Sequence, residues 1–326
     1  MGKAHRWLMS RLGGYTYKKL IKHLKLIRYS GHPQTSLSLY LTEICKQSSK
    51  EFFLVGRAEQ KARDALSKQM YDYLCNTYTS SRDDTLFDFN DVIIPKPIRD
   101  HDAYIFVGEF WDILLYHLID DKSFCDIVCD DGPYEYGNVV INDRDVVFDC
   151  GANAGTFSAI ASRKGATVYA FEPFEYIIDT YLTETAKWNP NINICKYAVS
   201  ETDGQVSFTG DINSIHSNRI SDNCVDEFDP SKEQVNDVMV EAIALDTFVE
   251  KNNIPYVHFI KADIEGAERD MLMGAKQILR EYAPKLSLCT YHLPDDSKVL
   301  RKLILEANPG YTVEERFSKM YAYVKK

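Results

Sequence analysis

Short apolar runs alternate with segments of helical periodicity along the C-terminal half of the chain. The apolar runs are continuous, which is typical of strands buried on both faces of a parallel sheet. Strands are predicted at 145–149, 167–171, 192–197, 257–262 and 285–290, and helices at 155–164, 175–188, 268–280 and 296–307. This alternation of strand and helix predicts an α/β domain built on a mostly parallel sheet with helices on both faces.

A polar insertion at residues 201–246 interrupts this alternation. Two apolar stretches inside it, 205–208 and 239–243, are predicted strands. Between them lies a loop rich in Ser, Asn and Asp, 210–237, which has no helical or strand periodicity. The insertion is therefore predicted to contain two strands joined by a polar loop.

Residues 1–129 have a different pattern and are predicted to form a mainly helical N-terminal region, followed by a second domain at 130–326. Helices are predicted within 1–30, over 50–78 and through 110–116. The first 42 residues, here called the basic arm, contain eight Lys or Arg and no acid. Two interpretations of the basic arm stay open: a solvated amphipathic helix on the body, or a segment that contacts a membrane surface or a partner protein.

The whole chain of 326 residues is acidic, with a formal net charge of −10. Because the basic arm concentrates positive charge, the remainder is more acidic still, which argues against nucleic acid as the main partner. The eight cysteines include no Cys-x-x-Cys pair or zinc-site spacing, so we expect reduced thiols. No apolar run reaches the roughly 18 residues of a membrane span. We expect a cytoplasmic protein, membrane-peripheral if the basic arm binds lipid.

The first strand–helix turn of the predicted sheet carries an acid and two glycines. Asp149 ends the strand, and Gly151 and Gly155 permit a tight turn with a close backbone approach. Asp149 is placed to accept a hydrogen bond from a ligand ammonium group or a water. Asn153 can donate from its amide, and Thr156 lies in the first helical turn, where free N–H groups face a ligand.

A second acid, Glu172, follows the next predicted strand. An acid at this position accepts hydrogen bonds from ribose hydroxyls, in nicotinamide and S-adenosylmethionine sites alike. The sequence of the first turn distinguishes between these two cofactor classes. A dinucleotide site requires G-x-G-x-x-G, whereas Asn153 replaces the middle glycine here and Asp149 would repel a pyrophosphate. The turn therefore favours the cationic S-adenosylmethionine.

Further acids and a histidine follow the later strands. Asp263 and Glu265 come directly after the fourth main strand, and His292 follows the fifth. Ligands of open α/β sheets bind beyond the carboxyl ends of the strands, so these side chains are candidate bases. Glu265 is alternatively a helix N-terminal acid favoured by the helix dipole, and His292 a structural histidine. A divalent ion held by Asp263 and Glu265 is a further alternative.

Several motifs together resemble the FkbM family of S-adenosylmethionine-dependent methyltransferases. They are Asp149-Cys150-Gly151-Ala152-Asn153-Ala154-Gly155, Phe171-Glu172-Pro173, Ala244-Leu245-Asp246-Thr247-Phe248 and Lys261-Ala262-Asp263-Ile264-Glu265-Gly266. The resemblance covers roughly residues 130–315. It implies a Rossmann-like class I methyltransferase fold with a mostly parallel seven-stranded sheet, closed by a hairpin of residues 311–313 and 320–323. It also implies O-methylation, often of a sugar hydroxyl in a glycan or natural product.

The predicted site has two parts. The residues expected to bind S-adenosylmethionine are Asp149, Gly151, Ala152, Asn153, Gly155, Thr156, Glu172 and Pro173. The residues expected to be catalytic are Asp263, Glu265 and His292, without a resident metal. Asp263 is predicted to take the acceptor proton, assisted by His292 or Glu265. The expected acceptor is a small molecule or glycan, and nucleic acid is not expected to be a partner.

Three other functions remain as alternatives from the sequence. A non-catalytic binding protein on a methyltransferase fold would require a lost cofactor site, yet both acids and both glycines are present. A nicotinamide-dependent oxidoreductase would use a related sheet. A nucleic-acid methyltransferase would need a basic groove, which the acidic body opposes.

Overall fold

The structure, a computed structural model, describes residues 71, 74–98, 133–210, 219–220 and 236–325. The basic arm, the predicted helices 1–30 and 110–116, most of helix 50–78 and most of the polar loop 210–237 lie outside these residues. Among the helices that the structure describes, none has the length and apolar character needed to cross a membrane.

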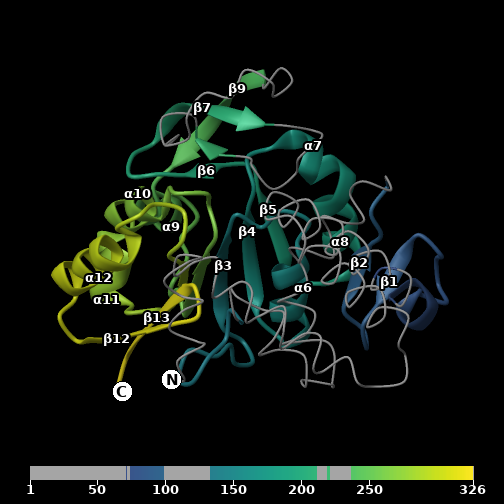
Figure 1. The fold of residues 1–326 in the computed structure, drawn as a ribbon, viewed down its shortest axis with the longest axis horizontal. Helices are drawn as coiled ribbons and strands as arrows, with labels where there is room; N and C mark the ends of the chain where they lie inside the picture. Colours follow the sequence, from purple (N-terminus) through teal and green to yellow (C-terminus); the bar gives the residue numbers. More distant parts are fainter. Residues whose placement is uncertain (1–70, 72–73, 99–132, 211–218, 221–235, 326) are drawn as a thin grey trace, which may run out of the picture.

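A seven-stranded sheet forms the centre of the molecule (Figure 1). Its order is β12-β13-β11-β10-β3-β4-β5, and the five strands β11 to β5 run parallel. The strands are β3 (Val146–Cys150), β4 (Thr167–Phe171), β5 (Ile192–Cys195), β10 (Phe259–Ala262), β11 (Lys285–Cys289), β12 (Tyr311–Arg316) and β13 (Lys319–Val324). The antiparallel hairpin β12–β13 closes one edge, as the resemblance implied. This strand order is that of the class I methyltransferase fold.

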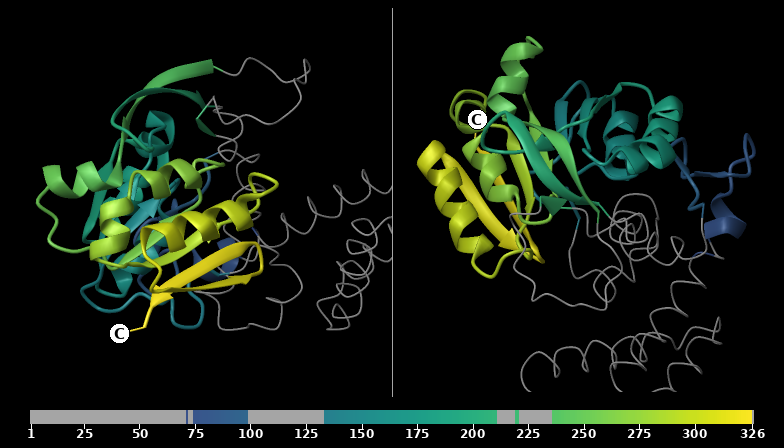
Figure 2. Two further views of the ribbon diagram at one scale, coloured as in Figure 1. Left: turned by 90° about the vertical axis from the view of Figure 1, so that its left-hand side faces the viewer. Right: turned by 90° about the horizontal axis from the view of Figure 1, so that it is seen from above.

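Helices cover both faces of the sheet (Figure 2). They are α6 (Thr156–Arg163), α7 (Glu175–Ile177), the π-helical segment η4 (Ile178–Leu182), α8 (Thr183–Trp188), α9 (Leu245–Lys251), α10 (Glu268–Met273), α11 (Lys276–Glu281) and α12 (Asp296–Ala307). Successive residues of a strand point to opposite faces. Val147 accordingly joins the core that holds α6, and Phe148 joins the core that holds α9 to α12. Burial on both faces explains why the strands are continuously apolar.

The predicted helix 268–280 is divided in two. Helix α10 ends at Met273 and α11 begins at Lys276, with Gly274 between them. A Cβ at Gly274 would lie 2.3 Å from the carbonyl oxygen of Ser200, so only glycine allows this close approach to the small sheet. Helix α9 was not among the predicted helices.

The insertion forms a second sheet of four strands at the top of Figure 1. Its order is β6-β9-β7-β8, with β6 (Ala198–Val199), β7 (Gly204–Gly210), β8 (Arg219–Ile220) and β9 (Asn236–Ile243). The two predicted strands of the insertion are thus confirmed as β7 and β9. Because β6 follows β5 after two residues, the insertion lies at the carboxyl end of the main sheet.

The described part of the N-terminal region contains strands that the sequence pattern did not predict. Strands β1 (Leu86–Asp88) and β2 (Ile93–Pro95) form an antiparallel hairpin. The buried amide of Asn189 donates to the carbonyl of Ile93, and its oxygen accepts from the Ile93 N–H. These bonds attach the hairpin to the end of α8.

Candidate active site

The acid that ends the first main strand lies in a buried ion pair. Asp149 is fully buried, and its Oδ1 lies 3.0 Å from the Nζ of Lys261 on the neighbouring strand β10. The Ser158 hydroxyl donates to Oδ2 at 2.6 Å. A buried carboxylate requires a countercharge, and Lys261 supplies it. The carboxylate of Asp149 is therefore engaged within the protein, whereas the sequence placed it against a ligand ammonium group.

The same lysine, which lies on β10, also contacts the first turn. The Lys261 ammonium donates to the carbonyl of Gly151 at 2.6 Å. Gly151 has φ +74°, and a Cβ there would lie 2.0 Å from the carbonyl oxygen of Asp263. The close approach that this glycine permits is thus made by the backbone beside the predicted base.

The start of α6 holds a second group of predicted cofactor residues. Gly155 has φ +82°, and a Cβ there would lie 2.6 Å from the Leu182 side chain. The Thr156 hydroxyl is buried in the first turn and has no hydrogen-bond partner among the residues that the structure describes. Buried hydroxyls are nearly always hydrogen-bonded, so this position suits a polar ligand. Ala152 is also buried in the turn.

Glu172 lies at the end of β4, directly beside the first turn. Its Oε2 accepts from the Asn153 N–H at 3.0 Å, and its Oε1 accepts from the Phe174 N–H at 2.9 Å. Burial raises the pKa of Glu172 to about 7, although both backbone hydrogen bonds oppose the shift. Pro173 lies between Glu172 and Phe174 in the chain. The structure therefore brings both predicted cofactor segments together around this carboxylate.

Asp263 follows β10 and is held by two tyrosines. The Tyr134 hydroxyl donates to Oδ2 at 2.5 Å, and the Tyr291 hydroxyl donates to Oδ1 at 3.2 Å. Its side chain is 23% exposed. Burial alone would raise the pKa of Asp263, but the positive charges of Lys261 and His292 lower it to about 2. The carboxylate is therefore ionised and reaches the surface of the site.

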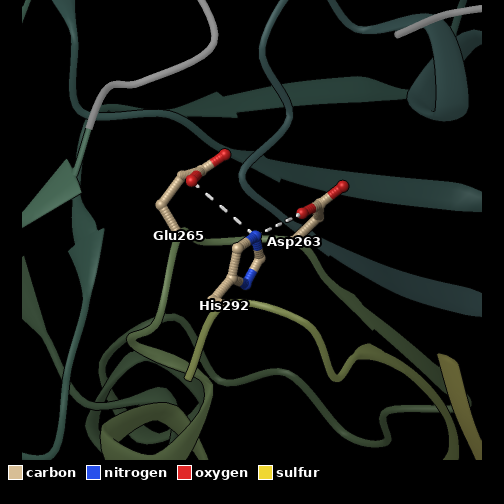
Figure 3. Close-up of side chains that lie close together, drawn as sticks. All are labelled: Asp263, Glu265 and His292. Carbon is tan, nitrogen blue, oxygen red and sulfur yellow. Dashed lines mark ion pairs between the residues drawn. The ribbon is translucent and has the colours of Figure 1, made fainter. Parts of the chain in front are cut away.

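His292 lies beside the carboxylates of Asp263 and Glu265 (Figure 3), and its other ring nitrogen faces a third carboxylate. Its Nε2 is 3.5 Å from Oδ1 of Asp263 and 3.7 Å from Oε2 of Glu265, while Nδ1 is 3.0 Å from Oε1 of the buried Glu268. Burial alone would lower the pKa of His292, but the Glu268 carboxylate, followed by Asp263 and Glu265, raises it to about 9. All three predicted catalytic residues thus meet at one place.

The loop between β10 and α10 is shaped by an acid in the following helix. Glu268 accepts from the N–H groups of Ile264 and Gly266, at 2.9 and 3.1 Å. Between these two residues, Glu265 has φ +54°, a conformation that is costly for a residue other than glycine. The buried Glu268 therefore fixes both the loop that presents Glu265 and the ring of His292.

Three residues of the site were not predicted from the sequence. Lys261 stood only within a motif, Tyr134 lay just before the first main strand without an assigned role, and Glu268 was interpreted as a helix N-terminal acid favoured by the helix dipole. A lysine inside an apolar strand was a usable signal, because such a charge needs a buried partner. The contact of Tyr134 with Asp263 had no such signal, since the two residues are 129 positions apart.

Comparison with known proteins agrees with these features. The sequence model of the methyltransferase FkbM domain matches residues 149–326, more than half of the chain. The chain belongs to the FkbM methyltransferase family. Because this is a family of methyltransferases, the alternative of a nicotinamide-dependent oxidoreductase has no support from the comparison.

Two kinds of relative can be named. The hexuronic acid methyltransferase AglP of Haloferax volcanii is 30% identical over 165 residues, which are 50% of this chain and 62% of that protein. The match therefore spans less than two thirds of AglP. The FkbM methyltransferase structure from Methylobacillus flagellatus KT is 21% identical, with a TM-score of 0.43 over 68% of this chain and 60% of that one. The Streptococcus mutans protein SMU.1697c, solved in complex with S-adenosylhomocysteine, is 12% identical, with a TM-score of 0.34 over 56% of this chain and 89% of that one.

Proposed function

We propose that this protein is an S-adenosylmethionine-dependent O-methyltransferase acting on a sugar hydroxyl of a glycan or glycosylated molecule. The observation that carries the proposal is the convergence of two sites on one edge of the sheet. Glu172 and the first turn form one site, and Asp263, Glu265 and His292 form the other. Gly151 lies between them, since a Cβ there would be 2.0 Å from the carbonyl oxygen of Asp263.

The residues around Glu172 fit the cofactor. The buried Thr156 hydroxyl, which has no partner within the described residues, is available to a polar ligand group, and Glu172 would accept hydrogen bonds from the ribose hydroxyls. Gly151 and Gly155 have positive φ and permit the tight turn that lies beside Glu172. When bound, S-adenosylmethionine supplies a methyl group already activated by its sulfonium centre. The protein then has to align the acceptor and remove a proton.

The ionised carboxylate of Asp263 suits a hydroxyl acceptor, because it can accept a hydrogen bond from that hydroxyl. As the hydroxyl oxygen gains the methyl group, its proton passes to the Asp263 carboxylate and then to water.

The relative AglP supports a carbohydrate acceptor, and a hexuronic acid offers both hydroxyls and a carboxylate. The decisive experiment incubates the purified chain with methyl-labelled S-adenosylmethionine and oligosaccharides that contain neutral sugars or hexuronic acids. We expect label in a base-stable ether. Label in a base-labile ester would overturn the hydroxyl assignment. Failure to bind S-adenosylhomocysteine in calorimetry would favour the non-catalytic alternative.

The affinity for S-adenosylhomocysteine is expected to decrease when the pH falls below about 7. Because the pKa of Glu172 is raised to about 7, the carboxyl is protonated at pH 6 and ionised at pH 8. Ribose hydroxyls bind the ionised form, so one proton is released on binding at low pH. The expected loss is about tenfold per pH unit below the pKa. Calorimetry in buffers of different ionisation enthalpy measures both the affinity and the proton release.

The variant Glu172→Gln tests the same carboxylate. Loss of charged hydrogen bonds worth about 1.5–3 kcal/mol weakens binding by roughly 10- to 100-fold and removes the pH dependence. Glu175→Gln is the matched control, because that acid is 78% exposed and three residues away. A pH-dependent affinity that persists in Glu172→Gln would assign the titration to another group.

A further inference from the structure

The side chains of Asp263, Glu265 and His292 have the composition and spacing of a metal-ligand set (Figure 3). One ligand atom from each residue lies within 4.8 Å of the others. Oxygen and nitrogen ligands at about 2.1 to 2.6 Å from one ion are separated by at most about 5 Å. A single cation between these three atoms therefore requires little movement of the side chains.

His292 provides an independent observation that points to a ligand. Its side chain is 7% exposed, and its Nε2 has no hydrogen-bond partner in the described part of the chain. That nitrogen is directed at the gap between Asp263 and Glu265, at 3.5 and 3.7 Å from their oxygens. These distances exceed ordinary hydrogen bonds, and a cation placed between the three atoms would provide the missing partner.

The surrounding residues resemble the outer shell of a metal site. Metal-binding histidines usually donate from their second ring nitrogen to a carboxylate, and metal-binding carboxylates are themselves hydrogen-bonded. Here Nδ1 of His292 lies 3.0 Å from the fully buried Glu268. Asp263 accepts from the hydroxyl of Tyr134. The left-handed backbone of Glu265, held by the Glu268 hydrogen bonds, presents the third ligand.

From this geometry we infer that Asp263, Glu265 and His292 bind one divalent cation of the Mn²⁺ class. Two carboxylates and one imidazole combine hard and borderline ligands, which suits this class. Three protein ligands leave positions for water or for oxygens of the acceptor. The ion would then hold a sugar hydroxyl beside the cofactor, and this role rests on the proposed function. The binding of the ion by the chain does not depend on the proposed function.

The test is a titration of the purified full chain with Mn²⁺, in which the paramagnetic resonance signal of the free ion is measured. We expect one ion per chain, with affinity reduced at least tenfold in Glu265→Gln and in His292→Asn. Glu306→Gln, an exposed acid on α12, is the matched control and should bind as the unmodified chain does. Calorimetry with S-adenosylhomocysteine verifies that each variant keeps its fold and cofactor site.

Two outcomes would overturn the inference. One is that the paramagnetic resonance signal of free Mn²⁺, at about 1 mM total Mn²⁺, is the same with and without the chain. A Kd above about 1 mM would correspond to only weak binding. The other is equal affinity in Glu265→Gln and the unmodified chain. Chelation is expected to reduce methyl transfer at least tenfold, with recovery on adding Mn²⁺, and a chelator-resistant rate would overturn the ion's role. If Mn²⁺ binds but no glycan is methylated, the proposed function fails and the metal site stands.

Discussion

Replacing Asp263 by Asn is expected to reduce kcat by roughly 10³-fold while S-adenosylhomocysteine still binds. A positioned carboxylate base contributes about 10²- to 10⁴-fold to a rate. The amide keeps the size of the side chain and can still accept from Tyr134, but it cannot take the acceptor proton. Single-turnover methyl transfer, measured with Mn²⁺ present in excess, separates loss of the chemical step from loss of ion binding.

A matched control for this variant is Asp143→Asn. Asp143 is an acid just before β3, and its side chain is 74% exposed. It should keep full turnover. Calorimetry should give similar affinity for S-adenosylhomocysteine in both variants, because neither residue is among those proposed to bind the cofactor. Unchanged turnover in Asp263→Asn would remove this carboxylate from the mechanism.

Replacing Gly151 by Ala is expected to lower the free energy of unfolding by about 2–5 kcal/mol. A left-handed backbone costs a residue with a Cβ about 1–2 kcal/mol, and overpacking adds about 1–3 kcal/mol. The new Cβ would lie 2.0 Å from the carbonyl oxygen of Asp263. This oxygen belongs to the backbone, so it can move away only at a substantial cost in free energy. Any movement would also displace the base, so turnover should fall together with stability. Urea unfolding followed by fluorescence measures the change.

Gly137→Ala separates the two costs. Gly137 has φ +59°, and a Cβ there would meet no atom of the described residues within 4 Å. This variant therefore carries the conformational cost without the steric one, and about 1–2 kcal/mol is expected. Equal destabilisation by the two substitutions would show that the contact with Asp263 is not what requires glycine at position 151.

The main sheet could be predicted from the sequence because its strands are buried on both faces. Continuous apolar runs that alternate with amphipathic helices are typical of a parallel sheet covered on both sides. The division of helix 268–280 had no comparable signal. Gly274 is costly but tolerated inside a helix, and its reason lies in Ser200, a distant residue whose carbonyl must approach it.

The site, too, could be predicted from the sequence only in part. Asp263, Glu265 and His292 could be placed at one edge because each follows a parallel strand, and the structure brings them together. Which groups a side chain meets depends on the neighbouring strands and loops. For Asp149, strand pairing placed Lys261 directly opposite, so the acid is neutralised inside the protein.

The order of apolar and polar residues along the chain, with its glycines and strand-end acids, was by itself sufficient to define the sheet, the family resemblance and the edge that holds the site. Only the tertiary structure decided that Lys261 neutralises Asp149, that Tyr134 binds Asp263, and that Glu268 orients His292. The physical reason is that periodicity is a local property, recorded in neighbouring residues. Pairing of buried charges depends on which distant segments the packed core brings within a few ångströms.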